Sequence, residues 1–168
     1  MNNFIIREAV KEDCKEIRRL IQELADFEKM PNGPQIDTKV LEDDGFNSEH
    51  PIFGCIVAEV DGENKEMIGY ALYFIAYSTW MGKAIYLEDI YVSPQFRSQG
   101  LGSKLFDTIA KKGLELGCCR MDFRVLNWNP ANEFYARKGA VDMTRLEGWH
   151  HYSLNKANME KLTSKTTV

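Results

Sequence analysis

The feature that most constrains this chain is a strand, a loop and a helix that follow one another between Ala84 and Gly117. The stretch from Ala84 to Val92 is rich in β-branched, aromatic and aliphatic residues and ends at Ser93-Pro94. This composition predicts a buried strand that is stopped by a turn. After Ser103 apolar residues recur at roughly helical spacing, and Gly117 can close the helix. The apolar stripe consists of Leu105, Ile109, Leu114 and Leu116.

The loop between the strand and the helix runs from Arg97 to Gly102 and contains glycines at 100 and 102. Two glycines at this spacing let the backbone come close to a bulky ligand, and the N–H groups at a helix start attract anions. Arg97 adds a fixed positive charge, so a pyrophosphate fits the pattern. Taken alone, the pattern is equally typical of a tight turn.

Strand, loop and helix together resemble the coenzyme-A pyrophosphate loop of the GCN5-related N-acetyltransferase superfamily. The similarity extends from Ile6 to the stretch around Trp149 and is strongest to the diamine and polyamine acetyltransferases, especially their thialysine N-epsilon-acetyltransferase branch. The further stretches that carry it are Leu87–Val92, Asn127–Asn129, Phe134-Tyr135, Gly139-Ala140 and Glu147–Trp149.

We expect an α/β (mixed α+β) fold with a mostly antiparallel sheet and helices on both faces. The expected strands are Phe4–Arg7, Ile52–Val60, Met67–Ala76, Ala84–Val92, Arg120–Leu126 and Trp149–Leu154. The expected helices run from a capping box at Asp13 and Glu16 to Phe27, and over Thr38–Asp44, Ser103–Leu116, Ala131–Lys138 and Asn155–Lys161. The resemblance implies that the sheet splays open beside Ala84–Val92.

Composition indicates a single domain over residues 1–168, with a disordered tail from about residue 162. The formal charge of −4, with no basic block, argues against a nucleic-acid partner. The sequence also predicts no membrane span and no secretory signal. The cysteines lack ligand spacing and the histidines lack cysteine partners, so we assign no metal and expect free thiols in the cytoplasm.

Acetyl transfer to an amine requires removal of a proton from the ammonium group, stabilisation of an oxyanion, and protonation of the leaving thiolate. The resemblance implies that Glu88 takes the amine proton, directly or through water. A solvated strand-end carboxylate is the alternative, although an acid inside an apolar strand needs a reason to be there. Because Glu88 and Asp89 are adjacent on a strand, we expect them to face opposite sides of the sheet.

Tyr135 follows a predicted strand on a short helix, where the resembling family has a tyrosine that protonates the coenzyme-A sulfur. A core tyrosine with a satisfied hydroxyl is the alternative. The stretch from Asn129 to Tyr135 is one residue shorter than the family pattern, so either Asn129 or Asn132 would contact the cofactor.

The resemblance also implies an oxyanion donor among the backbone N–H groups from Ile90 to Val92, and pairing of the pantetheine arm with the same strand edge. The implied acetyl-CoA contacts are Ile90, Tyr91, Val92, Arg97, Ser98, Gln99, Gly100, Leu101, Gly102, Ser103, Asn129, Asn132 and Tyr135.

Carboxylates beside an aromatic face suit an ammonium group. The positions that match the family's amine pocket are Phe27, Glu28, Glu88, Asp122, Glu147, Gly148 and Trp149. Polyamine enzymes carry an acid where this chain has Ser78, which favours a shorter cation.

The sequence therefore predicts an acetyl-CoA-dependent N-acetyltransferase for a primary amine of a small molecule, with thialysine or a lysine-like amine first. Diamines and polyamines are the close alternative, and an inactive acetyl-CoA-binding protein of the same fold is the alternative of another class. The presence of both Glu88 and Tyr135 favours an enzyme. The resemblance further implies a homodimer in which the last strand is exchanged.

Overall fold

The computed structural model describes residues 3–63 and 65–164, and the chain divides into two compact units, Met1–Leu126 and Asn127–Val168. The sheet and the helices that cover it belong to the first unit. The second unit contains three short helices, α4 (Ala131–Arg137), α5 (Met143–Glu147) and α6 (Lys156–Ser164). The expectation of one domain over the whole chain stays a prediction.

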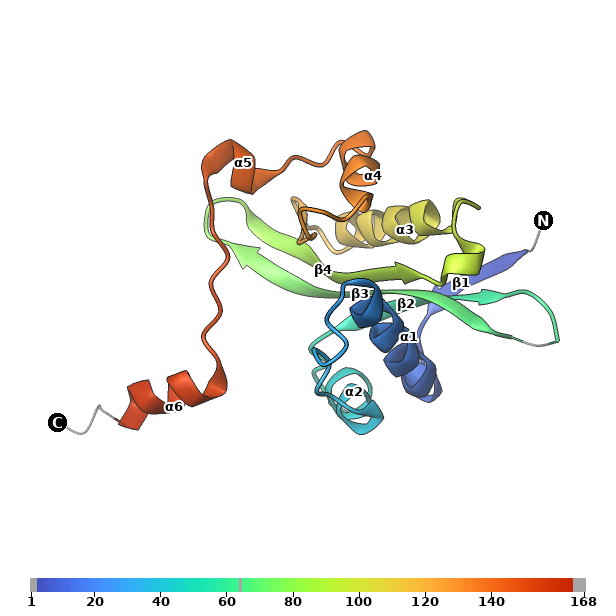
Figure 1. The fold of residues 1–168 in the computed structure, drawn as a ribbon, viewed down its shortest axis with the longest axis horizontal. Coiled ribbons are helices and arrows are strands. Elements are labelled where there is room, and N and C mark those ends of the chain that lie inside the picture. Colours follow the sequence, from blue (N-terminus) through green and yellow to red (C-terminus); the bar gives the residue numbers. More distant parts are fainter. Residues whose placement is uncertain (1–2, 64, 165–168) are drawn as a thin grey trace. The chain divides into compact units, whose positions relative to one another are not determined.

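The first unit is built on a five-stranded sheet in the order β1-β2-β3-β4-β5 (Figure 1). Its strands are β1 (Phe4–Glu8), β2 (Gly54–Val60), β3 (Met67–Ser78), β4 (Gly82–Val92) and β5 (Met121–Phe123). The first four strands are antiparallel to their neighbours, and β5 is parallel to β4. The expected hairpin of β2 and β3 is confirmed, and β5 is shorter than the predicted 120–126.

Helices cover both faces of this sheet, as expected. The helices α1 (Cys14–Phe27) and α2 (Thr38–Gly45) lie on one face, and α3 (Leu101–Glu115) lies on the other (Figure 1). Short 3-10 turns, η1 (Lys11–Asp13) and η2 (Pro94–Phe96), precede α1 and the glycine loop. The predicted mixed α/β fold is confirmed.

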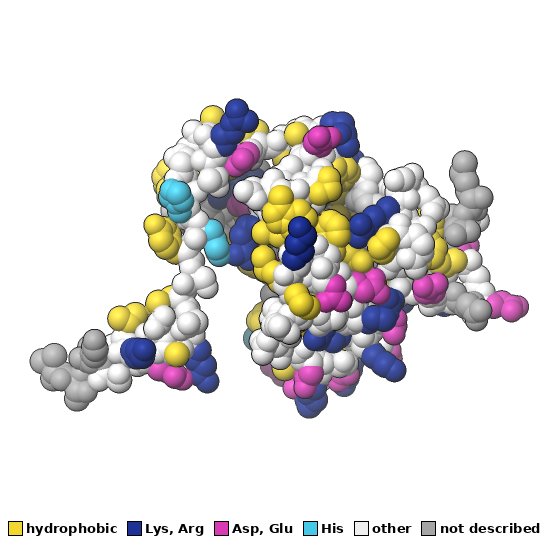
Figure 2. All heavy atoms as spheres, viewed as in Figure 1, with side chains coloured by type: hydrophobic (Ala, Val, Ile, Leu, Met, Phe, Trp, Pro, Cys, Tyr) yellow, Lys and Arg dark blue, Asp and Glu magenta, His cyan; other side chains and the backbone are white. Residues whose placement is uncertain are grey.

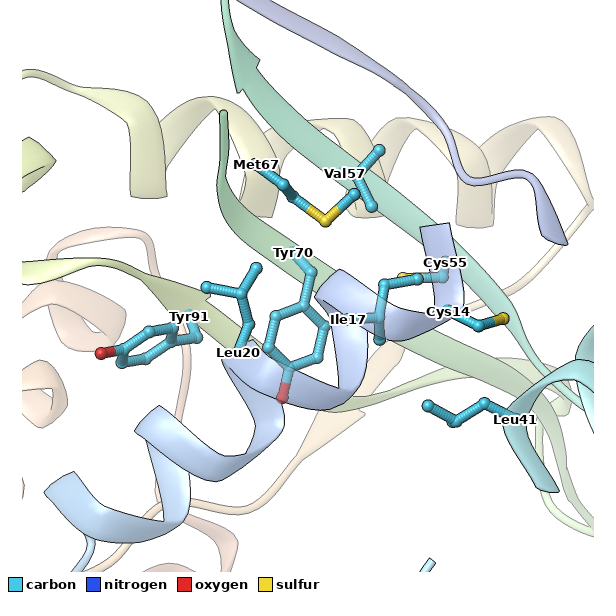
Figure 3. Close-up of a cluster of buried hydrophobic side chains, with 9 residues drawn as sticks. All are labelled: Cys14, Ile17, Leu20, Leu41, Cys55, Val57, Met67, Tyr70 and Tyr91. Atoms are coloured by element: carbon cyan, nitrogen blue, oxygen red, sulfur yellow. The ribbon is translucent and has the colours of Figure 1, made fainter. Parts of the chain in front are cut away.

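The core under α1 follows from the spacing of its apolar residues. Ile17 and Leu20 are 1% and 0% exposed, and they pack against Tyr70 of β3, which is also 0% exposed. Figure 3 shows the cluster, in which the Tyr70 ring lies beside Leu20 and Ile17. Such repeats at three and four residues bury one stripe of a helix.

Acidic and basic side chains are mixed over the outer surface of this layer. Figure 2 shows Lys and Arg interspersed with Asp and Glu on the face that carries α1 and α2. Several of these charges pair within one helix turn, for example Arg19 with Glu16 at 2.8 Å and Lys39 with Asp43 at 2.6 Å.

The capping box predicted at Asp13 and Glu16 is wrong. Asp13 makes no side-chain cap to α1. Its carboxylate instead accepts a 2.8 Å hydrogen bond from the Val10 N–H and pairs with Arg7 at 2.7 Å. Arg7 also pairs with Glu59 of β2 at 2.9 Å, so Asp13 ties the first turn to the sheet rather than starting α1.

The predicted stripe on α3 is correct at its start and wrong at its end. Leu105 and Ile109 are fully buried, but Leu114 is 75% exposed and Leu116 is 41% exposed. The position four residues after Ile109 is Gly113, which lies against Ile85 of β4. Leu114 is one residue further around the helix, about 100° from the buried stripe.

The strand predicted at Trp149–Leu154 is absent from the described chain. Residues 148–155 have no regular secondary structure, and Trp149 and Tyr152 are 58% and 88% exposed. A strand requires a neighbouring strand edge for its backbone hydrogen bonds, which sequence alternation does not supply. Residues 162–164 end α6, and residues 165–168 lie outside the described residues, so the disordered tail expected from about residue 162 stays a prediction.

Candidate active site

The edge of β4 that borders β5 opens halfway along the strand. The parallel pairing joins Ile85, Tyr86 and Leu87 to the three residues of β5 and ends there. Because β4 continues to Val92, its last five residues present one edge beyond the end of β5. The sheet therefore splays beside β4, and the glycine loop follows directly.

A one-residue bulge in β4 lies where this opening begins. Tyr73 pairs with Leu87, but the next residue of β3, Leu72, pairs with Asp89. Glu88 is the extra residue. A bulge of this kind reverses the alternation of the strand beyond it.

The reversal decides which backbone groups face the opening. The N–H of Ile85 donates to a carbonyl just before β5 at 3.0 Å, whereas the N–H of Ser93 donates to a carbonyl of β3 at 2.8 Å. On a regular strand these two groups, eight residues apart, would point to the same side. The N–H groups of Ile90 and Val92 are consequently directed toward the open edge, and that of Tyr91 is directed toward β3.

The bulge also corrects the expected placement of the two acids. Ile85, before the bulge, packs on α3, whereas Asp89 lies on the α1 face and accepts a 2.8 Å hydrogen bond from the Tyr70 hydroxyl. Glu88 follows Leu87 on the strand and therefore shares the α1 face with Asp89. The expectation that Glu88 and Asp89 face opposite sides is wrong.

Glu88 is the accessible member of the pair. Its Oε1 lies 3.2 Å from Nη2 of Arg124, and 39% of its side chain is exposed. Arg124 also lies over the Tyr86 ring, with its Cζ 5.8 Å from the ring centroid. A partly exposed carboxylate beside the open edge can reach a bound molecule, while the arginine holds its orientation.

Asp89 and Glu28 are partly buried acids on the same side of the sheet. Burial raises the pKa of Asp89, the charge of Glu88 adds to the shift, and the hydrogen bond from Tyr70 opposes it. Burial also raises the pKa of Glu28, which follows the last residue of α1, and the charge of Asp89 adds to that shift. Asp89 was not among the predicted site residues, because its place on this face depends on the bulge.

Asp122 of β5 joins this acidic face. Phe123, its neighbour, packs on Phe106 of α3 with the ring centroids 5.6 Å apart, so Asp122 points to the opposite face. Its carboxylate accepts a 2.8 Å bond from Arg120 and lies beside Tyr86 in the register. The predicted residues Glu28, Glu88 and Asp122 thus share the α1 face with Asp89.

The glycine loop is shaped for close approach of a ligand. Gly100 has a φ of +80°, which suits glycine, and it precedes the first turn of α3. A Cβ placed on Gly102 would meet no protein atom within 4 Å, so packing alone does not require a glycine there. Leu101 is 1% exposed and anchors the helix start, which leaves its backbone for a ligand. The N–H groups of this turn have no acceptors within the helix and fit a pyrophosphate.

The predicted cofactor residues of the second unit lie around the start of α4. Asn129 accepts a 2.9 Å bond from the Ala131 N–H, and Asn132 donates to the Asn129 carbonyl at 2.8 Å. Both asparagines therefore shape the turn before the helix. Tyr135 is half-buried on α4, and its ring packs edge-on against Phe134 at 5.2 Å.

The predicted amine-binding stretch at the end of α5 forms a local pair. Gly148 has a φ of +78° and reverses the chain, so that the Trp149 indole N–H donates to Oε2 of Glu147 at 2.5 Å. The pair offers a carboxylate beside an aromatic ring, which suits a cation.

The described residues contain no group of three or more His, Cys, Asp or Glu that could hold a metal ion. Within residues 3–63 and 65–164, no helix has both the length and the apolar character that crossing a membrane requires.

The open β4 edge and the glycine loop are the parts of an acyl-CoA-dependent transferase. Residues 8–140 match the Acetyltransferase (GNAT) family, and the chain belongs to this family. It is an acetyltransferase that uses acetyl-CoA. The chain is 43% identical to thialysine N-epsilon-acetyltransferase of Sus scrofa, over 98% of this chain and 100% of that protein.

A second relative is named for polyamine acetylation. The spermidine/spermine N(1)-acetyltransferase-like protein 1 of Homo sapiens is 36% identical over 95% of this chain, which corresponds to 24% of that protein. Among solved structures, AAC(6')-Iy in complex with the bisubstrate analogue CoA-S-monomethyl-acetylneamine aligns with a TM-score of 0.68 at 21% identity, covering 92% of this chain and 98% of that one. This similarity supports the fold.

Proposed function

We propose that this acetyltransferase acts on the primary amine of a small lysine-like molecule, with thialysine as the first candidate. The observation that carries the proposal is the acidic α1 face formed by Glu28, Glu88, Asp89 and Asp122 beside the open edge of β4. A face lined with carboxylates favours a compact ammonium group. The near full-length similarity to thialysine N-epsilon-acetyltransferases supports the same substrate.

Glu88 takes the proton of the amine, directly or through one water. A lysine-like ammonium has a pKa near ~10.4 and cannot attack until it loses a proton. Glu88 is accessible and is oriented by Arg124, and both features support this role. Asp89 lies behind Glu88 and accepts a hydrogen bond from the Tyr70 hydroxyl.

The backbone N–H groups of Ile90 and Val92 bind acetyl-CoA and the oxyanion that forms from its thioester carbonyl. Their direction toward the open edge supports an oxyanion contact and pairing with the amides of pantetheine. The pyrophosphate binds to the backbone of the loop from Arg97 to Ser103. Tyr135 gives a proton to the departing coenzyme-A thiolate, and either Asn129 or Asn132 contacts the cofactor.

The family resemblance implies further carboxylate and aromatic groups that hold the amine. In addition to the acids of the α1 face, these groups are Phe27 at the end of α1 and the Glu147, Gly148 and Trp149 stretch. The polyamine alternative is supported by the human relative and tested by the amine panel below.

The active form is a homodimer in which the segment around Trp149–Leu154 pairs with the partner subunit. The exposure of Trp149, Tyr152 and Leu154, at 58%, 88% and 51%, supports an uncovered apolar segment. Light scattering after gel filtration would give twice the chain mass of 19.3 kDa. The four free cysteines support a reducing compartment, in keeping with the proposed cytoplasmic location.

The proposed substrate is tested by measuring kcat/KM for thialysine, lysine, spermidine and putrescine under the same conditions. We expect the highest value for thialysine. A higher value for spermidine would assign the enzyme to polyamine acetylation instead.

A further inference from the structure

The Arg97 side chain joins the glycine loop to α1. Its Nε donates a 2.8 Å hydrogen bond to the Val92 carbonyl. Its Cζ lies 5.0 Å from the ring centroid of Phe27, the last residue of α1, and 5.3 Å from that of Tyr91. One planar guanidinium therefore contacts β4 and the helix that carries the proposed amine-binding residues.

A second link holds the same junction. Ser93, which is 4% exposed, donates from its hydroxyl to Oε2 of Glu23 at 3.0 Å. Glu23 lies one turn before Phe27 on α1 and also pairs with Arg19, whose Nη2 donates to the Met67 carbonyl at 2.7 Å. Hydrogen bonds from Arg19 and to Glu23 thus join α1 to the start of β3 and to the residue after β4.

Tyr91 lies between the two links. Figure 3 shows its hydroxyl pointing away from the rest of the buried cluster. Burial raises the pKa of Tyr91, the Glu23 carboxylate adds to the shift, and the Arg97 charge opposes it. Glu23, Tyr91 and Arg97 therefore act on one another at the junction where β4 becomes the glycine loop.

We propose that Arg97 is a positioning residue whose guanidinium couples acetyl-CoA binding at the glycine loop to amine binding at the end of α1. The proposal rests on the proposed function, because it takes the loop as the cofactor site and Phe27-Glu28 as part of the amine site. An arginine can do this through its planar fork, which hydrogen-bonds and stacks at the same time. The sequence pattern alone suggested a different role, a charge that neutralises the pyrophosphate.

The two roles predict opposite behaviour of two substitutions. Arg97→Lys keeps the positive charge and loses the planar fork, whereas Arg97→Gln loses the charge and keeps a planar N–H donor. A coupling role is damaged by the lysine exchange, and a charge role is damaged mainly by the glutamine exchange. Arg18→Lys is the matched control, because Nε of Arg18 also donates to a backbone carbonyl, that of Ile36, at 2.7 Å.

The test is calorimetric titration of thialysine into the full-length protein, with and without saturating coenzyme A, after melting curves show that each variant is folded. Because coupling between two ligands is reciprocal, the ratio of the two dissociation constants measures it. We expect coenzyme A to change the dissociation constant of thialysine by roughly 5-fold or more in the wild type and in Arg18→Lys. In Arg97→Lys the ratio should fall to near one while coenzyme A still binds.

A wild-type ratio of one, or an Arg97→Lys variant with the wild-type ratio, would overturn the coupling role. Loss of coenzyme A affinity in Arg97→Gln alone would assign Arg97 to charge neutralisation and also overturn it. Failure of the proposed function would be seen separately, as absence of acetyl transfer to any amine by the wild-type enzyme.

Discussion

The Tyr70 hydroxyl on β3 and Oδ2 of Asp89 on β4 are joined by a 2.8 Å hydrogen bond beneath α1. This bond exists because the bulge at Glu88 moves Asp89 to the face that a regular strand would have denied it. The consequence is that two consecutive acids face the same side, one held at the core and one accessible. We expect the inner acid to affect stability and charge, and the outer acid to affect turnover.

Asp89→Asn should change the pH dependence of stability. Because burial raises the pKa of Asp89, the folded state binds its proton more tightly than the unfolded state. The stabilisation of the folded state by the protonated Asp89 is present below the ordinary aspartate pKa. It is lost as the pH rises through the raised pKa. The free energy of unfolding of the wild type, relative to Asp89→Asn, should therefore fall in urea titrations as the pH rises above about 4, the ordinary aspartate pKa.

Asp43→Asn is the control, because its effect on the free energy of unfolding should change with pH in the opposite direction. Asp43 is an exposed acid of α2 whose pKa is lowered by its hydrogen bond from Lys39, so its contribution appears above its ordinary pKa and is lost on acidification. For Asp43 the free energy of unfolding of the wild type, relative to the asparagine variant, should rise with pH. The same rise for Asp89 would contradict a raised pKa of Asp89.

Glu88→Gln should lower kcat by roughly 10²- to 10⁴-fold, because a positioned general base contributes about that much and glutamine cannot accept the proton. The KM for acetyl-CoA should change little. Steady-state rates across a pH series measure both, with Glu115→Gln as the exposed control on α3. Turnover within a factor of a few of the wild type would remove Glu88 as the base.

Tyr135→Phe should lower kcat and leave the dissociation constant of acetyl-CoA unchanged, because it removes only the proton donor for the thiolate. Tyr77→Phe removes the hydroxyl of a tyrosine of β3 that is 77% exposed, and it serves as the control. If Tyr135→Phe turns over like the wild type, another group protonates the sulfur.

Replacement of two glycines of α3 by alanine should have different effects on stability and on acetyl-CoA affinity. At Gly113 the new Cβ would lie 2.8 Å from Cγ2 of Ile85, so the variant should lose about 1–3 kcal/mol of unfolding free energy. At Gly102 the Cβ meets open space, so stability should hold or rise by about 0.5–1 kcal/mol while acetyl-CoA affinity falls. Urea titration and calorimetry of the two variants measure these effects, and unchanged affinity in Gly102→Ala would place the pyrophosphate elsewhere.

Ser78→Asp should raise activity toward spermidine relative to thialysine. The Ser78 hydroxyl accepts from the N–H groups of Trp80 and Met81 at 3.3 and 3.2 Å, so it shapes the turn between β3 and β4. Aspartate and asparagine can both replace this acceptor, but only aspartate adds the charge that a long polycation needs. A matching change in Ser78→Asn would show that turn geometry, and not charge, sets the preference.

The parts of the fold that could be predicted are those fixed by local pattern. The three- and four-residue spacing of Ile17 and Leu20 predicts α1, and the glycines at 100 and 102 mark the helix start. The bulge at Glu88 could not be derived from alternation, because it depends on how Leu72 and Tyr73 of another strand are paired. Its consequence, the shared face of Glu88 and Asp89, was therefore missed.

The strand predicted from Trp149 to Leu154 was wrong for this chain for a related reason. Its composition favours a strand, but the sequence does not specify the edge against which it would pair. In the candidate site, the residue types were predictable, whereas the orientation of Arg97 and the inclusion of Asp89 depend on packing between distant segments.

The most direct test of the proposed function is free-thiol release from acetyl-CoA by the purified enzyme with thialysine, together with the mass of the amine product. We expect one thiol released for each acetyl group found on thialysine, and no release when the side-chain amine is replaced by a hydroxyl. Binding of acetyl-CoA without thiol release for any primary amine would contradict it.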